Sequence, residues 1–503
     1  MRGSYSVSVK TAKTFRRLRW LPFLVGILTL VSVLALAWQS PAAAVTPRHY
    51  TELEFPPLRE IQIPDYERYE LDNGLVVYLA EDHELPLVSG SVTFRTGERL
   101  VPLSTSGLGN IAGDAMRLGG TETYPSEVLN QALEQRAASV ETDVDLNSGL
   151  ASFSTLTEDL EAVFDIFTDV VRRPAFAPDR IEFLKNQYRG AINRRNDDPG
   201  DIASREFRKL VYGAESPYAR TIEYETLDAI SRNDIVQFYR ASVRPDHIIL
   251  AIVGDFESAA MKALIEASFA DWQVPNNVPD LPDTPFARQA QTGIFLVEQS
   301  QLSQSYVQIG HLGGQRNHPD HAALTVLNEV LNGFGGRLFN ELRSRQALAY
   351  SVYAFWAARY DYPGLFIGGG QTQSETTVPF IRAFQQEIAQ IRQMPVSEAE
   401  LARAKDAVLN SFVFNFQSPE QTLSRLIRYE YYGYPEDFVF QYRQAVADTT
   451  VEDVLAAAKT HLRPEDLVIL VVGNSAEIIP PLASLAPDQP VIQVDISIPE
   501  PGA

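Results

Sequence analysis

Cysteine is absent from this 503-residue sequence, which excludes disulfide bonds, thiol catalysis and cysteine-ligated zinc. Such a chain can be exported without forming stray disulfides. Basic residues are also scarce, with 43 lysines and arginines against 64 aspartates and glutamates and a formal net charge of −21. So acidic a protein repels nucleic acid and attracts basic peptides instead. The remaining composition, 45% hydrophobic, is that of a globular protein long enough for two or more domains.

The first 44 residues have the composition of a targeting segment. They contain no acidic residue and six basic ones, namely Arg2, Lys10, Lys13, Arg16, Arg17 and Arg19. The apolar run Leu21–Trp38 is long enough to span a bilayer as a helix, and Pro41-Ala42-Ala43-Ala44 resembles a signal-peptidase site. Residues 1–44 are therefore expected to be either a cleaved signal peptide or a membrane anchor formed by residues 21–38. In both cases the rest of the chain is expected on the periplasmic or luminal side.

The chain repeats itself with a shift of 219 residues. Residues 231–255 and 450–474 both read as a Ser/Thr-x-x-Asp helix start, a helix, an Arg-Pro turn and an apolar strand that ends near glycine. The predicted helices at 178–195 and 397–414 are separated by the same shift and run into Asp198-Pro199 and Ser418-Pro419. This periodicity indicates an internal duplication.

A proline-rich linker over residues 273–290 separates the two copies. Because strands cluster ahead of runs of helices, we expect an α+β fold of two homologous repeats, each a mostly antiparallel sheet packed with helices. The repeats are placed at residues 65–272 and 291–475, with a proline-rich surface extension over 476–503. In the first repeat we expect strands at 69–71, 75–79, 87–94, 139–145 and 150–155, and helices at 107–118, 126–136, 157–172, 178–195 and 199–211.

The segment Gly107–Met116 resembles the zinc-binding helix of the pitrilysin/insulinase/processing-peptidase family, which carries Gly-Leu-Ala-His-x-x-Glu-His-Met. The two histidine positions are held here by Asn110 and Asp114, and the position of the catalytic glutamate by Gly113. A third metal ligand of the family, a glutamate on a later helix, aligns with Ala191. The resemblance extends over residues 65–475 and implies a peptidase homologue that holds no metal and cannot cleave on its own.

Two residues that match the family's C-terminal half are retained. Arg343 and Tyr350 stand in register with an Arg/Tyr pair that, in the family, reaches the zinc site from the opposite repeat or partner subunit and stabilises the oxyanion. The pattern is that of the non-catalytic subunit of a heterodimeric processing peptidase. Its expected partner is a second family member that bears His-x-x-Glu-His and zinc, and the two would enclose unfolded or extended peptides.

Two alternatives remain open at this stage. One is a catalytically inert scaffold or peptide-binding protein of the same fold, and the other is an active metallopeptidase with an unorthodox site.

Two further segments also allow more than one reading. The strand Val140–Asp145, with acidic residues on one face, is either an edge that pairs with basic peptides or a charge-protected edge. The group His318-Pro319-Asp320-His321 is expected to serve helix capping and packing rather than metal binding.

Overall fold

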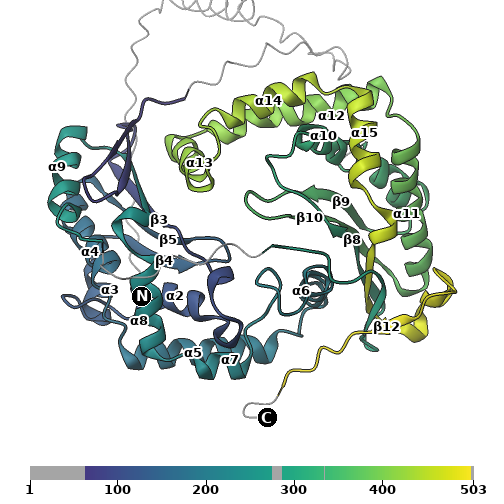
Figure 1. Ribbon diagram of the computed structural model, residues 1–503, viewed down its shortest axis with the longest axis horizontal. Helices are drawn as coiled ribbons and strands as arrows, with labels where there is room; N and C mark the ends of the chain where they lie inside the picture. Colours follow the sequence, from purple (N-terminus) through teal and green to yellow (C-terminus); the bar gives the residue numbers. More distant parts are fainter. Residues whose placement is uncertain (1–62, 275–285, 334, 500–503) are drawn as a thin grey trace, which may run out of the picture. The chain divides into compact units, whose positions relative to one another are not determined.

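The computed structural model describes residues 63–274, 286–333 and 335–499 (Figure 1). Within these ranges the chain forms two six-stranded sheets, one in each half, with helices packed around them. None of the described helices is long and apolar enough to span a membrane. The expected targeting segment, residues 1–44, and most of the expected linker, residues 275–285, lie outside the described ranges.

The N-terminal half contains a sheet with the strand order β1-β2-β6-β3-β5-β4. Neighbouring strands are antiparallel except for the parallel pair β2 and β6. The strands are β1 (Glu67–Glu70), β2 (Val76–Glu81), β3 (Leu87–Phe94), β4 (Ser139–Val144), β5 (Gly149–Leu156) and β6 (Ile248–Gly254). The helices are α2 (Leu108–Leu118), α3 (Ser126–Glu134), α4 (Leu160–Arg172), α5 (Pro178–Arg194), α6 (Pro199–Tyr212), α7 (Tyr224–Ala229), α8 (Arg232–Ser242) and α9 (Ser258–Phe269).

The C-terminal half contains the second sheet, in the order β12-β7-β11-β8-β10-β9. Its strands are β7 (Gly293–Glu298), β8 (Gln304–Leu312), β9 (Ser351–Ala357), β10 (Leu365–Gln373), β11 (Val468–Gly473) and β12 (Val491–Gln493). Its helices are α10 (His321–Leu331), α11 (Thr377–Gln393), α12 (Glu398–Ser411), α13 (Pro419–Tyr432), α14 (Phe438–Asp448) and α15 (Val451–His461), together with a π-helix at Phe339–Arg345.

Five strands of each sheet have the same order and the same directions, which confirms the predicted α+β fold with two similar halves. β2, β6, β3, β5 and β4 occupy the places that β7, β11, β8, β10 and β9 occupy in the second sheet. The helix starts that revealed the repeat are capping boxes in both halves. Ser231 and Asp234 cap α8 reciprocally, and Thr450 and Asp453 cap α15 in the same way.

The C-terminal segment differs from the surface extension that its prolines suggested. Residues 491–493 form β12, which pairs in parallel with β7 and takes the place that β1 has in the first sheet. Ile478 and Leu482 are buried in the C-terminal core. The physical reason is that β7 would otherwise expose an unpaired edge, which the backbone of β12 covers by pairing with it.

Each half covers one face of the other half's sheet with a helix. The strand β6 is buried on both faces, and its residues Ile249, Ala251 and Val253 pack against Leu423 and Ile427 of α13. The reciprocal contact joins α6 to β7 and β11 through a cluster of Ile202, Ala203, Phe207, Leu210, Val211, Phe295, Val297, Val468, Leu470 and Val472. The two halves therefore share apolar cores in addition to their own.

Candidate functional site

The helix α2, which carries the altered motif, begins at a buried carboxylate. The backbone N–H groups of Gly107 and Gly109 donate to the carboxylate oxygens of Glu98 at 2.6 and 2.8 Å. Burial raises the pKa of Glu98, while these hydrogen bonds act in the opposite direction. A carboxylate at this position satisfies the first free N–H groups of the helix and lies at the positive end of its dipole. Glu98 thus fixes where α2 starts.

Asn110, at the first histidine position of the motif, bonds to the edge strand of the sheet. Its Nδ2 donates to the carbonyl of Val144 at 2.9 Å, and the Nε of Arg117 donates to the carbonyl of Val140 at 2.8 Å. In the turn between β4 and β5, the N–H of Asp145 donates to the carbonyl of Ser148, and this bond fixes which backbone groups of β4 face β5. Because these groups alternate along an antiparallel strand, the carbonyls of Val140 and Val144 point away from β5. Side chains of α2 therefore occupy the outer edge of β4.

The C-terminal half uses asparagines of α10 in the same way. Asn328 accepts a hydrogen bond from the N–H of Trp356 at 2.7 Å and donates to its carbonyl at 3.3 Å. Asn332, just beyond the helix, makes the same paired contact with the backbone of Ala354. Both partners lie on β9, the edge strand of the second sheet. Asn110 thus has the structural role that Asn328 has in the other half.

Gly113, at the position of the catalytic glutamate, is the point where α2 lies directly on β4. A Cβ atom at this position would lie 2.4 Å from the backbone nitrogen of Val144 and 2.7 Å from the carbonyl carbon of Asp143. The Gly113 carbonyl also accepts a hydrogen bond from the hydroxyl of Thr142 at 2.6 Å. The space needed for a larger side chain is therefore filled by the backbone of the strand.

Asp114, at the second histidine position, is held by a tyrosine of α5. The hydroxyl of Tyr188 donates to Asp114 Oδ2 at 2.8 Å. Burial raises the pKa of Asp114, the nearby Asp143 raises it further, and the tyrosine lowers it. Ala191, on the same helix, is exposed and offers only a methyl group.

These residues do not fit a zinc ion. The Asn110 amide is engaged with the β4 backbone, Ala191 has no ligand atom, and the single carboxylate of Asp114 is already hydrogen-bonded. Helix α5 does face α2, as the resemblance implied, but the pair brings together a tyrosine and an aspartate rather than a ligand set.

Arg343 and Tyr350 lie together on the surface of the C-terminal half. The π-helix is anchored by the buried Leu342, and the guanidinium carbon of Arg343 lies 5.0 Å from the ring centroid of Tyr350 and 4.8 Å from that of Phe339. Tyr350 is 79% exposed. The guanidinium thus stacks on the phenol ring, and the hydrogen-bonding groups of both side chains are presented to solvent.

A cavity of about 600 Å³ lies between the first sheet and α13. Asp143 and Asp145 line it from the N-terminal half, and Arg359, Tyr360 and Arg428 line it from the C-terminal half. Burial raises the pKa of Asp143, and the charge of Asp145 adds to this effect. Both charge signs are therefore present in the cavity.

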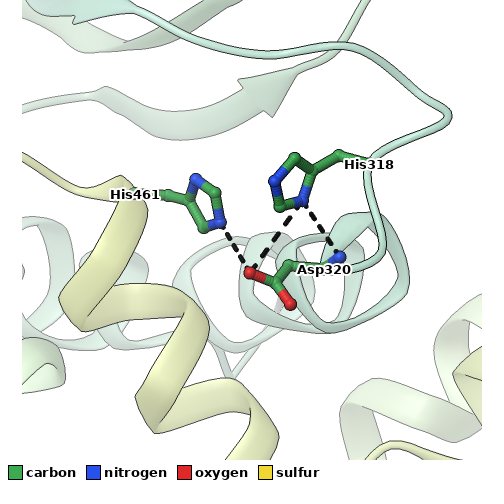
Figure 2. Close-up of side chains that lie close together, drawn as sticks. All are labelled: His318, Asp320 and His461. Carbon is green, nitrogen blue, oxygen red and sulfur yellow. Dashed lines mark hydrogen bonds and ion pairs between the residues drawn. The ribbon is translucent and has the colours of Figure 1, made fainter.

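The histidines near residue 320 are arranged differently from the expected local group. His321 is the first residue of α10 and is buried, its ring stacks on Tyr442, and burial lowers its pKa to about 3. His318 turns instead toward Asp320 and toward His461 at the end of α15 (Figure 2). His461 Nε2 lies 2.7 Å from Asp320 Oδ2.

Comparison with known proteins identifies the family. The model for the insulinase family, peptidase family M16, matches residues 76–220, and the model for the peptidase M16 inactive domain matches residues 229–408. The chain belongs to the insulinase (M16) family. Together the two models span the altered motif on α2 and the Arg343/Tyr350 region, so the predicted family relationship is confirmed.

The relatives include proteins described as lacking peptidase activity. The chain is 23% identical over 360 residues to the "Uncharacterized zinc protease YmxG" of Bacillus subtilis, covering 71% of this chain and 86% of that protein. It is 22% identical over 407 residues to the "Non-peptidase homolog YmxG" of Helicobacter pylori, covering 79% and 91%. A crystal structure of a peptidase M16 inactive domain from Pseudomonas fluorescens superposes with a TM-score of 0.74 at 23% identity, covering 83% of this chain and all of that chain.

This chain is therefore a peptidase-like member of the M16 family whose altered motif on α2 offers neither a zinc-ligand set nor a general base. The motif positions could be identified in the sequence, but their contacts could not. Glu98, Tyr188 and His461 carry no motif signal, because each acts through a partner that only the fold brings close.

Proposed function

We propose that this chain is the non-catalytic subunit of a two-subunit zinc peptidase of the M16 family. In this proposal it closes a chamber around an unfolded or extended peptide and presents Arg343 and Tyr350 to the active site of its partner. The partner is a second family member that bears His-x-x-Glu-His and holds the zinc. If residues 1–44 direct export, this assembly works on the periplasmic or luminal side, soluble or anchored by residues 21–38.

The observation that carries the proposal is the state of the Arg343/Tyr350 pair. Within the described part of the chain, neither side chain makes a hydrogen bond or an ion pair, although Arg345, two residues on, is paired with Glu341 at 2.6 Å. A guanidinium that serves only folding or solubility would gain from such a partner. Arg343 instead lies over the rings of Phe339 and Tyr350, and its five N–H donors have no hydrogen-bond partner among the described residues.

The chemistry suited to this pair is stabilisation of developing negative charge. A guanidinium and a phenol are both hydrogen-bond donors, and an oxyanion forms on the scissile carbonyl when a peptide bond is attacked. Donors oriented before the reaction stabilise that charge by several kcal/mol in a closed site. This chain's own α2 supplies neither a metal nor a base, so the pair is useful only in a site that another subunit completes.

The test is the turnover of an unstructured fluorogenic peptide by a His-x-x-Glu-His relative from the same organism, titrated with this chain. We expect the rate to rise and to saturate at one-to-one. Arg343→Ala should then lower the stimulated kcat by about 100- to 1,000-fold, the usual loss when one oxyanion donor is removed. Tyr350→Phe should lower it as well, because only the hydroxyl is lost.

The matched control is Arg345→Ala, which removes another exposed arginine from the same π-helix. It should leave both the stimulated rate and complex formation close to those of the wild type. Complex formation by Arg343→Ala, measured by size-exclusion chromatography, should also be unchanged. Stimulated turnover that survives Arg343→Ala would contradict the donated pair, and an absence of stimulation at any ratio would contradict the subunit proposal.

A second candidate function is a catalytically inert scaffold or peptide-binding protein of the same fold. The cavity between the first sheet and α13 favours it, because Asp143 and Asp145 offer charge to basic groups of a peptide, and Arg359 and Arg428 offer charge to acidic groups. Pairing of a peptide with the β4 edge is disfavoured, since side chains of α2 already hold two outward carbonyls of that strand. Saturable binding of a basic peptide with no effect on the relative's turnover would support this candidate.

A further inference from the structure

Three potential ligand side chains converge where the end of α15 meets the start of α10 (Figure 2). His318 lies in the loop before α10, Asp320 precedes the first residue of that helix, and His461 is the last residue of α15. One nitrogen from each histidine and one carboxylate oxygen lie within 4.8 Å of one another. No other such group of three is found among the described residues.

The distances between these atoms are close to those of a metal site. Ligands at 2.0–2.1 Å from a tetrahedral zinc ion are about 3.3 Å apart. His461 Nε2 lies 2.7 Å from Asp320 Oδ2, and His318 Nδ1 lies 3.9 Å from the same oxygen. The two distances bracket the tetrahedral value, and all three ligand atoms lie within 4.8 Å of one another, so the residues could be drawn onto one ion mainly by adjustment of the exposed His318.

The surroundings hold His461 firmly and leave the more exposed Asp320 and His318 side chains adjustable. Helices α10 and α15 pack against each other, and the His461 ring is 11% exposed and packs against Trp356 at 5.2 Å between ring centroids. His318, 44% exposed, lies in the preceding loop and can turn. Its Nδ1 accepts the backbone N–H of Asp320 at 3.1 Å, so this hydrogen bond would have to break, by a turn of the exposed ring, before the nitrogen could bind a metal.

We propose that His318, Asp320 and His461 form a site for a divalent transition metal of the zinc class, separate from the altered motif on α2. Two imidazoles and one carboxylate suit zinc, cobalt or nickel, whereas magnesium and calcium prefer oxygen ligands. Solvent would supply the fourth ligand. The ion would link the loop before α10 to the end of α15 and so stabilise the C-terminal half. The sequence had suggested no metal for this chain, because His461 lies 141 residues from Asp320.

The test is metal binding by the untagged full chain, since a polyhistidine tag would bind the same ions. After treatment with a chelator, Zn²⁺ should bind at one ion per chain in isothermal titration calorimetry and raise the melting temperature. Co²⁺ in its place should give the visible absorption of a four-coordinate complex. Mg²⁺ should change neither signal.

Variants locate the site. His318→Ala and His461→Gln should each lower zinc affinity by at least about tenfold, because loss even of a group that only supports a ligand costs that much. The control is His83→Ala. This variant removes an exposed histidine that lies beside Glu81 and Asp255 but has no second imidazole in its group. This control should bind zinc like the wild type.

Two results would overturn the proposal. One is a failure of Zn²⁺ to bind or to stabilise the wild type, and the other is unchanged affinity in the His318→Ala/His461→Gln double variant. If His461→Gln disturbs folding, His318→Ala remains decisive, because His318 is exposed in a loop and its removal leaves the His461–Asp320 contact intact.

Discussion

Gly113 determines how closely α2 approaches the edge of the first sheet. Any side chain there would press on the backbone of β4, which is held in place by β5 on its other side. Restoring histidines and a glutamate at positions 110, 113 and 114 would therefore not restore a site. The strand would first have to move, and the bonds from Asn110 and Arg117 would have to break. The loss of the catalytic motif is thus accompanied by closure of the space around it.

This packing makes Gly113→Ala destabilising although alanine favours helices. The added Cβ would overlap the backbone of Val144, and overpacking of this kind costs about 1–3 kcal/mol in the free energy of unfolding. The control is Gly190→Ala on α5, where no atom lies within 4 Å of the added Cβ. That variant should gain up to about 1 kcal/mol from helix propensity. Urea denaturation of both measures the difference, and two changes of the same sign would contradict the packing argument.

At this scale the sequence could identify positions but not partners. Local sequence patterns were enough to align four residues with the metal-ligand and base positions of the family, namely Asn110, Gly113, Asp114 and Ala191. The sequence does not show that Asn110 bonds to Val144, which is 34 residues away, or that Asp114 bonds to Tyr188, which is 74 residues away. Both contacts arise only in the folded chain. His461 likewise stands alone in the sequence, because only the fold brings it to Asp320, 141 residues away.

At the scale of elements, local signals were sufficient. The strand expected at 87–94 and the helices expected near 178–195 and 199–211 are present as β3, α5 and α6. Alternation, proline at the helix start and capping residues are all encoded within a few positions. The continuous apolar runs of β6 and β11 are typical of strands that are buried on both faces. They could not indicate that the second face is covered by a helix from the other half, because an amphipathic helix does not specify its partner.

Because each half packs a helix on the sheet of the other half, a substitution in one half should destabilise the other half as well. Phe207 on α6 is fully buried in the cluster that α6 forms with the second sheet, so Phe207→Ala should cost about 3–5 kcal/mol in the free energy of unfolding. The Phe207→Ala variant should speed hydrogen exchange mainly at the amides of β11, which lies beyond residue 467. The control Phe183→Ala, on an exposed part of α5, should change stability by at most about 0.5 kcal/mol. Faster exchange confined to residues before 275 would contradict the shared core.

At the scale of the whole chain, duplication and exchange make the two halves interdependent. Besides the apolar clusters, Arg99 pairs with Asp361, Tyr212 donates to the carbonyl of Pro363, and Tyr218 stacks on Tyr362 with ring centroids 4.2 Å apart. A half on its own would expose the apolar face of its exchanged helix and one face of its sheet. Large exposed apolar surfaces of this kind cause aggregation.

We therefore expect the halves to remain associated when the connection between them is cut. A recognition sequence for a specific protease, inserted between residues 279 and 280, allows the folded chain to be cleaved. The fragments should co-elute in size-exclusion chromatography in 1 M salt, because apolar cores hold them and salt screens only the ion pairs. They should separate in urea, and the N-terminal fragment produced alone should be insoluble. If 1 M salt separated the fragments, ion pairs such as Arg99–Asp361 rather than the exchanged helices would hold the halves together.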